Sequence, residues 1–176
     1  MPSKIIIVIA KKDFKDEEYF VPKEILEEAG FLVETVSSEK GIARGVDGGE
    51  VAIDSTLENV DLKSAIALIL IGGGGAQVYL ENEILHNLIR NAAAKEMIIG
   101  AICIAPAILA KAGILKDRKA TVWANPLDKK FARILEKHGA KYLNQMVVVD
   151  GNIVTADGPE AAELFAQTIV LKLKRA

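Results

Sequence analysis

The chain has 176 residues, of which 51% are hydrophobic and 26% charged, and its net charge is −2, which excludes an intrinsically disordered chain. One cysteine excludes a disulfide scaffold, and one cysteine with two histidines argues against a zinc site or any other metal site of the Cys/His kind. The near balance of 22 basic and 24 acidic residues leaves no basic surface of the type that binds nucleic acid.

Apolar, β-branched segments alternate along the chain with segments of helical periodicity, and the length suits one domain that covers residues 1–176. This alternation predicts an α/β fold with a mainly parallel sheet and helices on both faces. In chain order we predict strands at 4–10, 31–37, 64–71, 97–102 and 120–123, helices at 19–29, 78–95, 104–113, 127–138 and 160–174, and hairpins within 44–54 and 146–155.

The apolar segments are too short for targeting or membrane insertion. The apolar segment 5–10 is shorter than the hydrophobic part of a signal peptide. The apolar segment 65–71 is far shorter than the roughly 20 residues needed to cross a bilayer. We therefore expect a soluble, cytoplasmic protein with no membrane partner, in which the cysteine stays reduced unless it is a sensor or a catalyst.

Cys103 lies between the predicted strand 97–102 and the predicted helix 104–113. A nucleophile at such a sharp turn is presented at the carboxyl edge of the sheet, where α/β proteins bind ligands. The positive end of the following helix is expected to stabilise the thiolate and lower the pKa of the thiol. The alternative is an inert cysteine buried in the core.

Four consecutive glycines, Gly72–Gly75, follow another buried strand. Their N–H groups would serve as an oxyanion hole or anion site, or the run is simply a tight turn. The dinucleotide fingerprint and the P-loop pattern are both absent, and we predict no cofactor.

Three acidic residues, Asp16, Glu17 and Glu18, begin the first predicted helix, where carboxylates ordinarily favour the helix dipole. Glu18 has a second interpretation. If it points back over the sheet, its carboxyl would have a raised pKa beside the cysteine and would carry a proton to or from a substrate. His86 and His138 fall in predicted helices away from this edge.

Several segments in a fixed order carry a resemblance to a known family. They are Glu18 with Pro22, and residues 51–54, 68–73, 101–106, 148–155 and 158–162. In these segments the chain resembles the ThiJ/PfpI superfamily, which includes the Parkinson-associated protein deglycase and the archaeal intracellular proteases. The resemblance implies a three-layer, flavodoxin-like sandwich of the class I glutamine amidotransferase type, and a homodimer or higher homo-oligomer.

The resemblance also implies roles for individual residues. Cys103 corresponds to the reactive elbow cysteine, and Glu18 to the acid that hydrogen-bonds its sulfur. The backbone N–H groups of Gly73 and Ile104, with Gly72 beside them, correspond to the oxyanion donors.

Four positions depart from the family pattern, and one of them is Ala105, which stands where the family has glycine between the cysteine and the proline. Ile104 stands where the intracellular proteases commonly have histidine, and Trp123 stands where the deglycase branch has one. In the protease branch a neighbouring subunit lends a carboxylate from the segment after the glycines, and Gln77 lies near that place. Trp123 and Gln77 are expected to line the site. No histidine of this chain matches a site position, and the family triad is incomplete.

Three functions follow as alternatives. The first is a stress-related enzyme, a glyoxalase or deglycase, in which Cys103 attacks a small reactive carbonyl compound and Glu18 moves the proton. The second is a redox sensor or chaperone that is not an enzyme, in which Cys103 is oxidised to a sulfinate. The third is a cysteine peptidase or amidase, against which the missing histidine argues.

Overall fold

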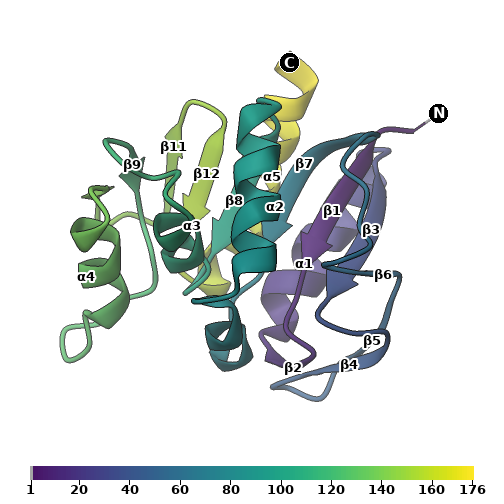
Figure 1. Cartoon of the computed structure of the whole chain (residues 1–176), viewed down its shortest axis with the longest axis horizontal. Coiled ribbons are helices and arrows are strands. Elements are labelled where there is room, and N and C mark those ends of the chain that lie inside the picture. The colour runs from purple at the N-terminus through teal and green to yellow at the C-terminus, as the bar shows by residue number, and fades with distance from the viewer. Residues whose placement is uncertain (1) are drawn as a thin grey trace.

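The computed structural model describes residues 2–176 and has a seven-stranded sheet at its centre (Figure 1). The strand order is β11-β12-β8-β7-β1-β3-β6, and every neighbouring pair is parallel except β11 with β12. The strands are β1 (Lys4–Val8), β3 (Leu32–Ser37), β6 (Ser55–Thr56), β7 (Ala65–Leu70), β8 (Ile98–Ile102), β11 (Val147–Asp150) and β12 (Ile153–Ala156).

Helices cover both faces of this sheet, which confirms the predicted three-layer α/β fold (Figure 1). One face carries α1 (Asp16–Glu28) packed against α5 (Ala162–Arg175). The other carries α2 (Glu83–Ala94) and α3 (Pro106–Ala112), and α4 (Lys130–Lys137) packs beside α3. Two 3-10 turns, η1 (Gly74–Tyr79) and η2 (Pro159–Ala161), precede α2 and α5. None of the helices within residues 2–176 is both long and apolar enough to cross a bilayer.

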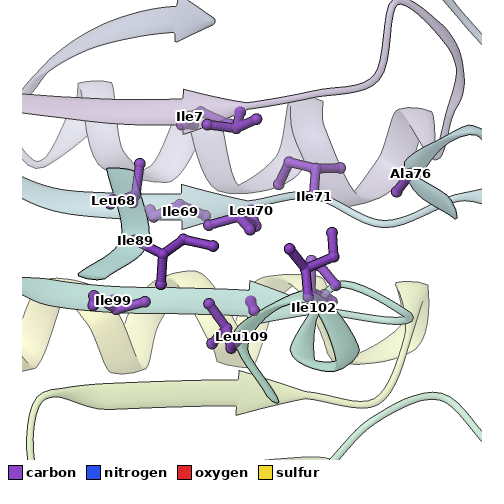
Figure 2. Close-up of a cluster of buried hydrophobic side chains, with 14 of the residues drawn as sticks. Ile7, Leu68, Ile69, Leu70, Ile71, Ala76, Ile89, Ile99, Ile102 and Leu109 are labelled. Atoms are coloured by element: carbon purple, nitrogen blue, oxygen red, sulfur yellow. The ribbon is translucent and has the colours of Figure 1, made fainter. Parts of the chain in front are cut away.

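The core lies between the helices and the central strands. All five residues of β8, four of the five in β1 and four of the six in β7 are buried, as a parallel sheet covered on both faces requires. In Figure 2, Ile89 of α2 and Leu109 of α3 lie over β7 and β8, and both side chains are fully buried. This packing fixes the carboxyl ends of β7 and β8 side by side.

Several predicted boundaries were wrong for local reasons. The helix predicted from residue 78 begins at Glu83, because residues 74–79 form a 3-10 turn and Asn82 caps α2 by accepting the N–H of Leu85 at 2.9 Å. The strand predicted at 120–123 is reduced to β9 (Lys119–Ala120), which pairs with β10 (Lys141–Tyr142). The short strands β6 and β10 were not predicted.

A small second sheet of β2 (Lys12–Phe14), β4 (Gly41–Gly45) and β5 (Glu50–Ile53) lies beside the start of α1. Asp16 stabilises the turn between β4 and β5, since its carboxylate accepts the N–H groups of Asp47 and Gly49 at 2.8 and 2.6 Å. Asp16 is therefore more than the helix-dipole residue expected from the sequence. It fixes β4 and β5 against α1.

Candidate active site

The site lies at a topological switch of the sheet. The connection after β1 runs through α1 on one face, and the connection after the neighbouring β7 runs through α2 on the other. Open α/β sheets bind ligands outside the carboxyl ends of such strands. Glu18 comes from the first connection, Gly72 from the second, and Cys103 directly follows β8 beside them.

Cys103 occupies a strained elbow. Its φ of +63° lies in the left-handed region, which residues other than glycine rarely adopt. Hydrogen bonds hold the backbone on both sides, because Cys103 donates its N–H to the Ala156 carbonyl at 2.9 Å and accepts the N–H of Trp123 at 2.8 Å. The side chain is only 8% exposed, so the sulfur is presented less openly than the sequence pattern suggested.

Glu18 is fully buried next to this cysteine. Its Oε2 accepts the N–H of Gly72 at 3.0 Å, and its carboxyl group lies within hydrogen-bond reach of the Cys103 thiol. Its Oε1 has no hydrogen-bond partner of good geometry among the described residues. Burial raises the pKa of Glu18 to about 7, although the bonds to Cys103 and Gly72 act in the opposite direction.

The glycine run allows segments of backbone to approach one another closely. A Cβ at Gly72 would lie 2.5 Å from the Cβ of Cys103 and 2.8 Å from Oε2 of Glu18. Gly73 has a φ of +97° and packs against the backbone of residues 13–15, and Gly75 packs against Lys12. The run is thus a tight, closely packed turn, in which the Gly73 N–H reaches the Cys103 sulfur.

The protonation of Cys103 differs from the expectation. Burial raises the pKa of the thiol to about 12, and the charge of Glu18 adds to this rise. The N–H groups of Gly73 and Ile104 lie close to the sulfur and oppose the rise without overcoming it. The predicted fall in pKa was therefore wrong: α3 has only seven residues, and its end does not outweigh burial beside a carboxylate.

The two predicted lining residues lie on segments that adjoin the Cys103 turn, Trp123 after α3 and Gln77 on η1. Trp123 is bonded through its backbone to Cys103, and its ring makes an edge contact with Phe131, with ring centroids 6.3 Å apart. Gln77 is exposed on η1, where its Nε2 donates to the Gly74 carbonyl at 3.3 Å. Its Oε1 accepts Nζ of Lys130 at 3.4 Å.

Lys130 and Phe131 were not identified from the sequence. They begin α4 after a loop, and the only signal in that region was the amphipathic pattern of the helix.

Both histidines lie outside this arrangement, as expected. His86 is buried on α2, with Nδ1 3.4 Å from a Glu83 carboxylate oxygen, and His138 ends α4. The residues whose groups shift the pKa of the Cys103 thiol are Glu18, Gly73 and Ile104, and none of them is a histidine. Within residues 2–176 there is also no group of three or more His, Cys, Asp and Glu side chains placed to hold a metal ion.

A family model described as the DJ-1/PfpI family matches residues 3–172. The chain belongs to the DJ-1/PfpI family. It is 31% identical to the deglycase PfpI of Pyrococcus furiosus over 169 residues, which cover 96% of this chain and 99% of the relative. It is 28% identical to the glutathione-independent glyoxalase DJR-1.2 of Caenorhabditis elegans, covering 96% of this chain and 88% of the relative. The crystal structure of a ThiJ/PfpI domain protein from Brachyspira murdochii superimposes with a TM-score of 0.94 at 30% identity, covering 99% and 98% of the two chains.

Proposed function

We propose that this DJ-1/PfpI protein acts on small reactive carbonyl compounds, in the manner of a glyoxalase or deglycase, with Cys103 as nucleophile and Glu18 as proton carrier. One observation carries the proposal: a fully buried carboxyl group with a pKa of about 7 lies within hydrogen-bond reach of the chain's single cysteine. The deglycase and the glyoxalase among the relatives support the same chemistry.

In the proposed reaction, Glu18 performs the proton transfers for which related sites have a histidine. A pKa of about 7 leaves a large fraction of the carboxyl groups ionised at neutral pH, which suits a general base. Glu18 takes the thiol proton while the Cys103 sulfur forms a bond to the carbonyl carbon. The π electrons move to the carbonyl oxygen, which receives the proton back from Glu18, and the product is a hemithioacetal.

The same geometry favours aldehyde addition over amide hydrolysis. Cleavage of an amide also requires an acid that protonates the leaving nitrogen, a role that histidine ordinarily fills. Here Ile104 and Trp123 occupy the positions at which that histidine was expected. A single carboxyl group beside the sulfur is sufficient for the addition step.

The test is consumption of methylglyoxal and glyoxal by the wild type and by Cys103→Ser, Glu18→Gln and Glu17→Gln variants. We expect no turnover with Cys103→Ser, a fall in kcat of about 10²-fold or more with Glu18→Gln, and wild-type activity with Glu17→Gln, whose side chain is exposed on the same helix. Wild-type protein that consumes neither aldehyde between pH 5 and 9, or undiminished activity in Cys103→Ser, would disprove the proposal.

A redox function is the second candidate, because two N–H donors and a carboxyl group that is protonated below about pH 7 surround the sulfur. These groups suit a sulfinate anion. Two equivalents of peroxide would convert the Cys103 thiol to sulfinic acid and release two waters. Intact mass after mild peroxide should show this product in the wild type and less of it in Glu18→Leu, and equal oxidation in both would remove Glu18 from the role.

A further inference from the structure

Lys130 contacts residues of two segments that adjoin the Cys103 turn, η1 and the start of α4. Its Nζ is 3.4 Å from Oε1 of Gln77 and 5.3 Å from the centroid of the Phe131 ring. Phe131 in turn contacts the ring of Trp123. Trp123 is hydrogen-bonded to the Cys103 backbone, and Gln77 is hydrogen-bonded to Gly74 in the glycine turn whose Gly73 N–H lies close to the Cys103 sulfur. The ammonium group thus connects η1 with the start of α4, and both segments are linked through these contacts to the turn that holds Cys103.

The charge of Lys130 is not neutralised by its neighbours. Both contacts of its Nζ, the Gln77 amide oxygen and the Phe131 ring, are uncharged. Within residues 2–176 no carboxylate oxygen lies within 4.0 Å of this ammonium group. The nearby Asp128 carboxylate accepts the backbone N–H of Lys130 at 2.9 Å, just before α4. An ammonium group with only neutral partners remains available to an anion.

We propose that Lys130 recognises a carboxylate on the carbonyl compounds that Cys103 attacks, so that the site prefers anionic aldehydes such as glyoxylate to neutral ones. A carboxylate would replace the weak, neutral partner Gln77 and form a charge-assisted hydrogen bond. The inference rests on the proposed function for the identity of the substrate. The preference of the Cys103 site for anions is nevertheless measurable without turnover.

Iodoacetate and iodoacetamide provide the measurement, because they differ chiefly in charge. Each forms a bond from its methylene carbon to the Cys103 sulfur while the carbon–iodine bond breaks, iodide leaves and the thiol proton passes to solvent. Cys103 is the only cysteine, and total mass therefore reports this one site. The quantity compared is the ratio of the iodoacetate rate to the iodoacetamide rate at low salt.

We expect Lys130→Met to lower this ratio about fivefold, the size of one close charge–charge interaction in water, and salt to reduce the difference. Lys130→Arg should keep the wild-type ratio. Lys129→Met, the matched control, removes the same charge from the neighbouring exposed residue and should change the ratio by less than about twofold. An unchanged ratio in Lys130→Met, or equal falls in the two methionine variants, would overturn the assignment.

A second arm separates this inference from the proposed function. Glyoxylate and glyoxal are tested for protection of Cys103 against iodoacetamide, since a hemithioacetal blocks alkylation. Stronger protection by glyoxylate in the wild type, lost in Lys130→Met, supports the inference. If neither aldehyde protects but the alkylation ratio changes, the proposed function fails and anion recognition stands. If both aldehydes are consumed but the ratio is unchanged, the function stands and Lys130 has no such role.

Discussion

The buried carboxyl group of Glu18 makes a quantitative prediction about stability. Its pKa is about 7 in the folded protein against a usual value of 4.5. Between these values the folded state binds a proton that the unfolded chain has released, so the free energy of unfolding falls as pH rises. Each unit of difference between the two pKa values is worth about 1.4 kcal/mol. The free energy of unfolding therefore falls by about 3 kcal/mol as the pH rises from 4.5 to 7. Glu18 is fully buried, so solvent does not screen this contribution.

The assay is urea denaturation of the wild type and of Glu18→Gln from pH 4 to pH 8. The free energy of unfolding of the wild type, minus that of the variant, should fall by about 3 kcal/mol across this range. Cys103, with a pKa of about 12, does not titrate in this window, and other carboxyl groups cancel in the difference. Glu17→Gln, in which an exposed residue changes, should show a flat difference. A flat difference for Glu18→Gln, or one that rises with pH, would refute the interpretation, because a rise would mean that the ionised carboxylate is the stabilised form.

Three further predictions concern the same region. Gly72→Ala should lower the free energy of unfolding by about 2 kcal/mol or more through overpacking. Gly74→Ala, the control, should change it little, because a Cβ there would meet nothing within 4 Å. Equal effects of the two substitutions in urea denaturation would contradict this prediction. Glu18→Gln should lower the pKa of the Cys103 thiol, read from the pH dependence of its alkylation by iodoacetamide, because it removes the charge that helps to raise that pKa, and an unchanged or higher pKa would argue against that cause. Asp16→Ala should cost about 3 kcal/mol and expose the two amides that it binds to hydrogen exchange, and unchanged protection of those amides would show that the hairpin is held otherwise.

The sequence predicted those features that depend on local pattern. An apolar strand followed directly by a helix placed Cys103 at its elbow, and four consecutive glycines marked the close approach at the end of β7. The alternation of strands and helices was enough for the layered fold. The position of Glu18 came from the family resemblance, since a carboxylate at a helix start has an ordinary capping interpretation as well.

Features that depend on distant segments could not be predicted in this way. The pKa of Cys103 depends on how completely other parts of the chain cover the sulfur, and the local pattern suggested the opposite direction. Asp16 binds a turn about 30 residues later in the chain, as the contacts with residues 47 and 49 show. Lys130 contacts Gln77, which lies 53 positions earlier in the sequence, and the pattern of the helix that Lys130 begins does not reveal this contact.

Because neither histidine lies at the site and Glu18 is buried, the pH dependence of the proposed reaction can be predicted from Glu18 alone. A thiol with a pKa of about 12 supplies almost no thiolate at neutral pH, so the proposed reaction depends on the fraction of Glu18 that is ionised. That fraction rises through about pH 7, the pKa of the carboxyl group. Thus kcat/KM for aldehyde consumption should rise through about pH 7, and the rise should be lost in Glu18→Gln. A profile that keeps the same inflection in Glu18→Gln would assign it to another group, and the carboxyl would then have only a structural role beside Cys103.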